Sequence, residues 1–110
     1  MNLQGVRALL RQGKIELDLS LPHALTEARK EGLTTEDLEL AVMTGQIVED
    51  YGERTLLLHF ATDYQIPFHV VLEFVPGDKV ATVVTAYIPD SKLWEADWKT
   101  RKRTRKQKKS

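Results

Sequence analysis

The clearest pattern in the chain is a pair of β-rich runs on either side of the turn Pro76-Gly77-Asp78. In the first run, residues 66–74, one face carries Phe68, Val70, Leu72 and Phe74. The other face carries His69, Val71 and Glu73. The second run, residues 79–87, is rich in β-branched residues and stops before Pro89, which cannot continue a central strand. The alternation predicts two neighbouring strands, with one face toward the core and a second face that can carry chemistry.

Three helices are predicted on the N-terminal side of these strands. Their apolar residues recur at helical spacing, and capping residues, a proline and glycines mark their ends. The third helix has the best-defined start, because Thr34 and Asp37 have the spacing of a capping box. The predicted helices cover residues 2–12, the segment from Pro22 up to Gly32, and the segment from Thr34 up to Gly45.

The remaining patterns predict an α+β fold with a four-stranded antiparallel sheet. Residues 46–51 and 54–61 add two strands, and the short connections favour a meander with the helices packed on one face. Residues 15–19 predict a short strand at the sheet edge. Residues 92–102 predict a short C-terminal helix with Trp94 and Trp98 on one side, a spacing that favours packing onto the domain over stacking on bases.

Charge divides the chain into a body and a tail. Its 110 residues suffice for one domain, which we assign to residues 1–98. All sixteen acidic residues lie at or before Asp97, whereas eight of the sixteen basic residues follow Trp98. Residues 1–98 therefore carry a net charge of −8, and residues 99–110 form a tail of +8 that we expect to be disordered. The tail would attract RNA through Lys99, Arg101, Lys102, Arg103, Arg105, Lys106, Lys108 and Lys109.

Composition excludes several classes of protein. No stretch approaches the roughly 18 apolar residues that cross a bilayer, and we expect no secretory signal. The chain has no cysteine, which excludes disulfides and thiolate metal ligands. The three histidines lack the spacing of a zinc site. We therefore predict a cytoplasmic protein with no metal, no cofactor and no membrane partner.

Four side chains are candidates for catalysis. Cleaving RNA without a metal needs a base for the 2′-hydroxyl, an acid for the leaving oxygen and donors or cations for the phosphorane. Histidine suits both proton roles near neutral pH, so we select His23 on the second helix and His69 on the sheet. Thr85 and Tyr87 share a strand face and would hold the phosphate. Sequence alone does not bring the two histidines together, and both also fit ordinary solvated positions.

Several short motifs occur in an order that is more specific than any one of them. They are His23-Ala24 followed by Gly32-Leu33-Thr34 and Glu36; Gly45 with Ile47-Val48-Glu49-Asp50-Tyr51; Pro67-Phe68-His69-Val70-Val71; and Thr85-Ala86-Tyr87-Ile88-Pro89-Asp90 with Trp94. In this order, over roughly residues 15–103, the chain resembles a small bacterial family called domain of unknown function 4258, which is grouped with RelE-like and BrnT-like toxins.

The resemblance implies a fold like that of RelE and the barnase-type ribonucleases, an RNA substrate that includes ribosome-associated mRNA, and an antitoxin protein as partner. By position, it supports His23, His69, Thr85 and Tyr87 as site residues. One position departs from the family, because Glu27 stands where members often carry an arginine. The cation for the phosphorane must then come from elsewhere, or activity is weakened or absent.

Three functions stay open at this point. The first is a toxin-like, metal-independent endoribonuclease. The second is a non-catalytic module that binds nucleic acid or ribosomes through the tail, which Glu27 and the acidic body favour. The third is a protein–protein module in which the acidic body of one chain pairs with the basic tail of another.

Overall fold

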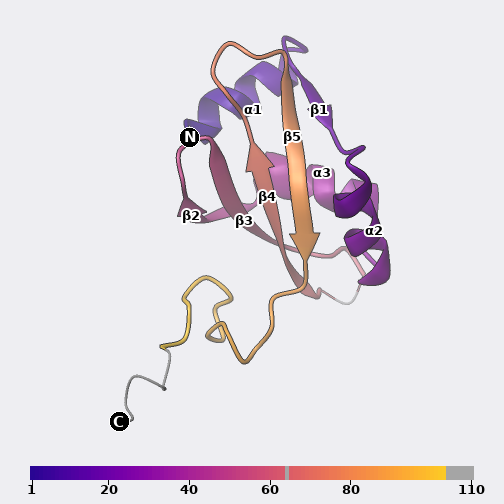
Figure 1. Cartoon of the computed structure of the whole chain (residues 1–110), viewed down its shortest axis with the longest axis vertical. Helices are drawn as coiled ribbons and strands as arrows, with labels where there is room; N and C mark the ends of the chain where they lie inside the picture. Colours follow the sequence, from indigo (N-terminus) through magenta and orange to yellow (C-terminus); the bar gives the residue numbers. More distant parts are fainter. Residues whose placement is uncertain (64, 104–110) are drawn as a thin grey trace.

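The predicted α+β class is confirmed in the part of the chain that the structure, a computed structural model, describes: residues 1–63 and 65–103. Within these residues the chain forms three helices and one sheet of five strands, ordered β1-β5-β4-β3-β2 (Figure 1). The helices are α1 (Leu3–Arg11), α2 (Pro22–Lys30) and α3 (Thr35–Thr44). The strands are β1 (Glu16–Asp18), β2 (Gln46–Asp50), β3 (Arg54–Phe60), β4 (Pro67–Glu73) and β5 (Val80–Tyr87).

The prediction of a purely antiparallel, four-stranded sheet is wrong by one strand. Strands β2 to β5 form the predicted antiparallel meander. The edge strand β1 joins them, but it pairs with β5 in parallel, with Glu16 opposite Val80 and Asp18 opposite Thr82. Parallel neighbours need a long crossover, and here the connection passes through α2, α3 and the three strands β2 to β4. The sequence of the three-residue strand β1 does not indicate that its partner is β5.

The hydrophobic core lies between the helices and one face of the sheet. Ala24 and Ala28 of α2 and Leu38, Ala41 and Val42 of α3 are buried there. They belong to the same cluster as the sheet residues Leu57, Phe68, Val70, Leu72, Ala81, Val83 and Ala86. Figure 1 shows α3 behind the sheet and α2 beside β5. The opposite face of the sheet is left for other contacts, and we call it the second face.

A buried arginine ties α1 to the end of α3. Arg7 donates a hydrogen bond from Nε to the carbonyl oxygen of Val42 and one from Nη2 to that of Gly45, both at 2.7 Å. Carbonyls at a helix C-terminus lack partners within the helix, so the guanidinium satisfies groups that would otherwise be buried without one. Arg7 thereby fixes α1 against the remainder of the fold.

The predicted capping box of α3 is confirmed. The Thr34 hydroxyl accepts from the Asp37 amide, and the Asp37 carboxylate accepts from the Thr34 amide, both at 3.0 Å. The other carboxylate oxygen of Asp37 accepts from the amide and hydroxyl of Thr62. Burial alone would raise the pKa of Asp37, but these hydrogen bonds outweigh it and lower the pKa. One carboxylate thus joins the start of α3 to the loop after β3.

The predicted C-terminal helix over residues 92–102 is wrong, because this segment forms a short hairpin. The Lys102 amide donates to the Leu93 carbonyl at 2.9 Å, and the Glu95 amide donates to the Thr100 carbonyl at 2.8 Å. The Asp97 carboxylate accepts from the amides of Lys99 and Thr100 at the turn. An aspartate that satisfies nearby amides competes with helix formation, which explains the difference. We call residues 93–102 the C-terminal hairpin.

The basic tail predicted to start at Lys99 begins inside this hairpin. Lys99, Arg101 and Lys102 belong to it, and Arg103 follows it directly. The other predicted RNA-binding residues, Arg105, Lys106, Lys108 and Lys109, lie outside the described residues. Disorder was predicted for residues 99–110; residues 99–102 belong to the hairpin, and residues 104–110 lie outside the described residues. In the part of the chain that the structure describes, none of the helices has the length and apolar character needed to cross a membrane.

We predict that Asp37→Ala lowers the free energy of unfolding by about 2 kcal/mol at pH 7, because charged hydrogen-bond acceptors contribute roughly 1.5–3 kcal/mol. The lowered pKa of Asp37 means that its contribution is present above the unfolded value of 3.8 and is lost as the pH falls through the folded pKa. Urea unfolding at pH 7 and pH 3 measures this. Glu39→Ala, an exposed position on α3, is the control and should change stability by less than about 0.5 kcal/mol. Equal losses at both pH values would contradict the prediction.

Candidate active site on the second face

Strand register places a histidine beside a tyrosine on the second face. Residues directly opposite each other in an antiparallel pair point to the same side of the sheet. His69 is opposite Leu58 of β3 and Tyr87 of β5. Val71, two residues along β4, is opposite Leu56 and Thr85. The sequence-predicted residues His69, Thr85 and Tyr87 therefore lie together on this face.

Two β-bulges determine which side chains reach the second face. Between β4 and β5 the register shifts, so that Val71 is opposite Thr85 but Leu72 is opposite Val83, leaving Val84 as an extra residue. Without this extra residue, Thr85 and Tyr87 would face the core with Ala81 and Val83. A second shift, between β2 and β3, moves Glu49 opposite Leu56. Bulges redirect side chains in this way and are over-represented beside active sites.

The C-terminal hairpin covers part of the second face. Trp94 is only 3% exposed, and its ring meets the ring of His69 edge to face at a centroid distance of 4.7 Å. Leu56 and Leu58 are also buried, although neither belongs to the main core cluster. The guanidinium of Arg101 lies 4.6 Å from the centre of the Trp94 ring, in cation–π geometry. The hairpin thus closes a second, smaller apolar cluster around His69, and the packing predicted for Trp94 is confirmed.

His69 has no exposed surface, which the sequence did not indicate. Its Nε2 is 2.6 Å from the Trp98 carbonyl oxygen and its Nδ1 is 3.2 Å from the Tyr87 hydroxyl. Because a carbonyl only accepts, Nε2 carries the proton, and Nδ1 accepts from the tyrosine. Burial lowers the pKa of His69, although the hydrogen bond to Trp98 and the charge of Glu49 partly oppose this. The imidazole is therefore neutral near pH 7.

Tyr87 connects this buried histidine to the charged part of the site. Its ring meets that of His69 edge to face at a centroid distance of 5.3 Å, and Tyr87 is half-buried. Burial raises the pKa of the Tyr87 hydroxyl, while Arg101 lowers it and Glu49 raises it further. The phenol therefore keeps its proton at neutral pH and donates a hydrogen bond to His69 Nδ1.

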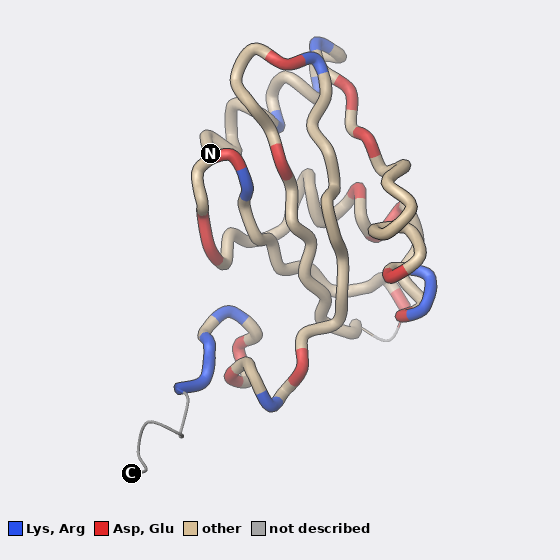
Figure 2. The backbone as a smooth tube through the Cα atoms, viewed as in Figure 1, with Lys and Arg blue, Asp and Glu red and all other residues tan. Residues whose placement is uncertain are grey.

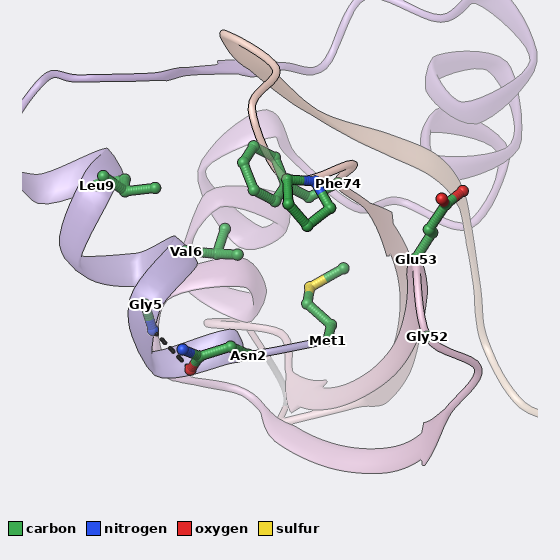
Figure 3. Close-up of a pocket in the computed structure, with 9 residues that line it drawn as sticks. Met1, Asn2, Gly5, Val6, Leu9, Gly52, Glu53 and Phe74 are labelled. Atoms are coloured by element: carbon green, nitrogen blue, oxygen red, sulfur yellow. Dashed lines mark hydrogen bonds between the residues drawn. The ribbon is translucent and has the colours of Figure 1, made fainter.

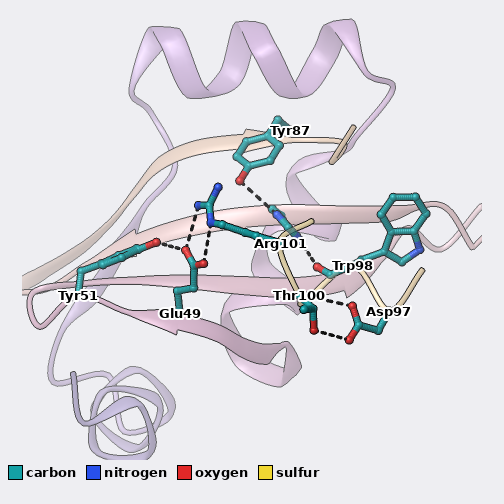
Figure 4. Close-up of polar contacts among 8 residues, drawn as sticks. Glu49, Tyr51, Tyr87, Asp97, Trp98, Thr100 and Arg101 are labelled. Carbon is teal, nitrogen blue, oxygen red and sulfur yellow. Dashed lines mark hydrogen bonds and ion pairs between the residues drawn. The ribbon is translucent and has the colours of Figure 1, made fainter. Parts of the chain in front are cut away.

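A carboxylate and a guanidinium complete the group (Figure 4). Arg101 Nε is 2.8 Å from one oxygen of Glu49, and Arg101 Nη2 is 3.1 Å from the other. The hydroxyl of Tyr51 also hydrogen-bonds to the Glu49 carboxylate. Figure 4 shows the Arg101 side chain reaching between Glu49 and Tyr87. Hydrogen bonds to Glu49 raise the pKa of Arg101, so this cation is permanent.

The surroundings of this group are cationic on one side. Lys99, Lys102 and Arg103 are all exposed and lie within five residues of chain that also carry Arg101. Figure 2 shows this basic segment at the C-terminal end, whereas acidic residues are spread over the body. A phosphate that approaches Arg101 therefore meets further positive charge nearby.

His23 lies apart from this group as far as its contacts show. It is exposed on α2, and within residues 1–63 and 65–103 its side chain makes no hydrogen bond or ion pair. The Glu27 carboxylate, one turn further along α2, lies 3.6 Å from Lys30 Nζ. Thr85 is half-buried on the second face, and in the described part of the chain its hydroxyl has no hydrogen-bond partner. The roles assigned to His23 and Thr85 stay predictions.

Glu49 and Tyr51 were not selected from the sequence as site residues. Their positions two apart at the end of a strand place them on one face, which is a weak signal. The bulge at Val48 decides that this face is the second one, and nothing in the local sequence marks the bulge. Arg101 was selected as a basic residue, but its pairing with Glu49 depends on the hairpin.

A larger hollow among the described residues lies elsewhere. A cleft of about 670 Å³ opens between α1 and the turns that follow β2 and β4 (Figure 3). Its lining is apolar, with Val6, Leu9 and Phe74, apart from Asn2, which caps α1, and Glu53. This cleft brings no group of reactive side chains together. Nowhere in the described residues do three metal-ligating side chains gather into a candidate metal site.

Comparison with known protein families assigns the chain to one of them. A family described as Domain of unknown function (DUF4258) matches residues 21–92. The chain belongs to this family. The match covers the segment from α2 to the end of β5 and so includes Glu49, Tyr51, His69 and Tyr87 of the site. The whole C-terminal hairpin, with Trp94 and Arg101, follows the matched segment. The family carries no assigned function, so membership establishes the relationship alone.

Neither a curated protein nor a solved structure matches the chain. The likeness to RelE-like and BrnT-like toxins therefore stays a prediction.

Burial of His69 predicts a specific pH dependence of stability. Because its folded pKa is lower than the unfolded value of 6.5, the unfolded chain binds a proton first, and stability declines as the pH falls below about 6.5. Urea unfolding at pH 8 and pH 5.5 should show this loss in the natural chain and in His59→Gln, a half-buried control. His69→Gln should show a smaller loss. An imidazole of His69 that titrates at 6.5 or above by NMR would contradict the prediction.

Proposed function

We propose that the chain is a metal-independent endoribonuclease whose active site is the Glu49, Arg101 and Tyr87 group on the second face. One observation carries the proposal. A carboxylate, a permanent cation and a protonated phenol lie together, which are the base, the charge stabiliser and the proton donor that phosphodiester cleavage by a 2′-hydroxyl needs. The resemblance to toxin ribonucleases and the basic hairpin support the same activity.

Arg101 would bind the scissile phosphate. Its guanidinium is exposed on the side away from Trp94, and its fork of N–H groups matches phosphate oxygens in geometry. In the free protein this fork is occupied by Glu49. A phosphate that takes over one of these hydrogen bonds would free a carboxylate oxygen at the same moment. Arg101 would thereby supply the cation that Glu27 cannot.

Glu49 and Tyr87 would move the protons. Glu49 would take the proton of the 2′-hydroxyl as its oxygen attacks phosphorus. Tyr87 would turn its hydroxyl proton from His69 Nδ1 toward the 5′-oxygen and donate it there as the P–O bond breaks. The products are a 2′,3′-cyclic phosphate and a 5′-hydroxyl end. Tyr87 then regains a proton from water while Glu49 releases one, so the balance closes.

His69 would position Tyr87 and would not touch the substrate. It is completely buried, and both of its ring nitrogens have partners. Its Nδ1 orients the tyrosine hydroxyl, and the Trp98 carbonyl fixes the tautomer that makes this possible. The acid/base role predicted for His69 from the sequence is thus revised to a positioning role.

A non-catalytic nucleic-acid-binding module is the second candidate. The observation that favours it is the direct ion pair between Arg101 and Glu49, which occupies the carboxylate proposed as base. In that case the basic hairpin would hold RNA without cleaving it. Both candidates agree with an RNA-directed role in the cytoplasm, and the antitoxin partner stays a prediction under either.

We expect the purified protein to cleave purified RNA in the presence of EDTA and to leave 2′,3′-cyclic phosphate ends. Glu49→Gln should lower the cleavage rate at least ~100-fold, which is the usual loss for a general base. Tyr87→Phe and Arg101→Gln should lower it by a similar factor, as measured by gel analysis of end-labelled RNA. Glu39→Gln, which removes an exposed carboxylate on α3, is the matched control and should keep full activity.

His23→Ala in the same assay tests the assignment made from the sequence. A loss as large as that of Glu49→Gln would move a proton-transfer role to α2. Intact RNA under every condition, from folded protein that still binds RNA, would overturn the nuclease and favour the binding module.

Salt dependence tests the hairpin as the RNA contact. Single-stranded binding loses about 0.7 log units of affinity per log unit of salt for each phosphate contacted. Replacing Lys99, Lys102 and Arg103 with glutamine should therefore reduce this slope by up to about 2, as measured by fluorescence anisotropy with labelled RNA. The control replaces three exposed cations far from the hairpin in sequence with glutamine and so changes the net charge by the same amount. These are Lys14, which follows α1, and Arg29 and Lys30 of α2. Equal slopes for both triple variants would show that the hairpin is not the contact.

A further inference from the structure

Tyr51 presents an exposed aromatic ring at the edge of the proposed active site. It is 61% exposed, the largest exposure among the large apolar and aromatic side chains of the described residues. It follows β2 directly, at the turn into β3, where its amide donates to the Arg54 carbonyl. An aromatic ring left this open gains little from packing in the folded chain.

The ring is nevertheless held in place. Its hydroxyl is hydrogen-bonded to Glu49, and Glu49 is held by two hydrogen bonds from Arg101 (Figure 4). The polar end of Tyr51 is therefore fixed at the carboxylate, while most of the residue's surface stays open to solvent. A ring fixed at one end loses less conformational freedom when a flat ligand stacks on it.

We infer that Tyr51 is a stacking platform for an unpaired base, and that the chain acts on single-stranded nucleic acid. The inference rests on the proposed function for the position of the scissile phosphate, which Arg101 would hold. Glu49 contacts both Arg101 and Tyr51, so a base that adjoins a phosphate held at Arg101 would lie within reach of the Tyr51 ring. Bases inside a duplex stack on each other and offer no free face.

The adjoining charges agree with this ligand. Lys99, Lys102 and Arg103 are exposed and would follow the phosphates, while the ring would receive a base. Aromatic rings interleaved with cations are the usual surface for single strands, and stacking is tolerant of sequence because every base has a flat face. The protein would therefore select single-stranded over double-stranded nucleic acid and would not prefer one base over another.

The test uses single-stranded DNA oligonucleotides, which lack the 2′-hydroxyl and are not cleaved by the proposed mechanism. One oligonucleotide carries bases, and a second of equal length and charge is abasic. Fluorescence anisotropy should show that the natural chain binds the first about tenfold more tightly than the second and more tightly than a duplex of the same length. Tyr51→Leu, which keeps an apolar side chain without a flat ring, should remove this preference.

Two variants separate stacking from support of Glu49. Tyr51→Phe and Tyr51→Trp lose the hydrogen bond to Glu49 but keep a flat ring, so both should retain the preference for bases. Leu40→Ala, at an exposed position on α3, is the control and should bind as the natural chain does.

Each result has one meaning. Equal binding of the abasic and base-carrying strands by the natural chain, or a preference that survives in Tyr51→Leu, would overturn the inference even if RNA is cleaved. Tyr51-dependent binding from a protein that leaves RNA intact would uphold the inference and overturn the nuclease.

Discussion

An imidazole buried on the face of a sheet must find a partner for each of its nitrogens, and much of this structure meets that requirement. His69 takes one partner from β5, the Tyr87 hydroxyl, and the other from the C-terminal hairpin, the Trp98 carbonyl. Loss of either hydrogen bond would leave a buried polar nitrogen without a partner, which costs roughly 1–3 kcal/mol. The hairpin is therefore docked by a directed hydrogen bond as well as by the apolar contact of Trp94, and docking brings Arg101 to Glu49.

The same arrangement explains why the charged groups lie at the rim and the neutral ones below. The aromatic cluster of Trp94, Tyr87 and His69 is buried or half-buried, whereas the side chains of Arg101 and Glu49 keep part of their surface exposed to water. An exposed ion pair is weak, contributing about 0–1 kcal/mol, so an anion of the kind proposed as substrate could replace Glu49 at little cost. The buried aromatic cluster therefore holds the hairpin in place, while the weak ion pair between Arg101 and Glu49 can open.

Much of the fold followed from local patterns, and most of the site did not. The capping box of Thr34 and Asp37, the turns and the alternation in β4 predicted α3 and the meander correctly, because each depends on residues close in sequence. The parallel pairing of β1 and the hairpin around Asp97 depend on distant or side-chain partners. His69 beside Tyr87 was anticipated, but the bulges at Val48 and Val84 that set the faces leave no trace in hydrophobic periodicity.

The bulge at Val48 also bears on how the chain behaves in a crowded solution. Strand β2 is the last strand of the sheet, and a regular, flat edge strand offers its free amides and carbonyls to any other chain. An extra residue twists that edge, and the charges of Glu49 and Asp50 stand along it. Both features discourage edge-to-edge aggregation. The irregularity that turns Glu49 toward Arg101 therefore also helps keep neighbouring copies of the sheet apart.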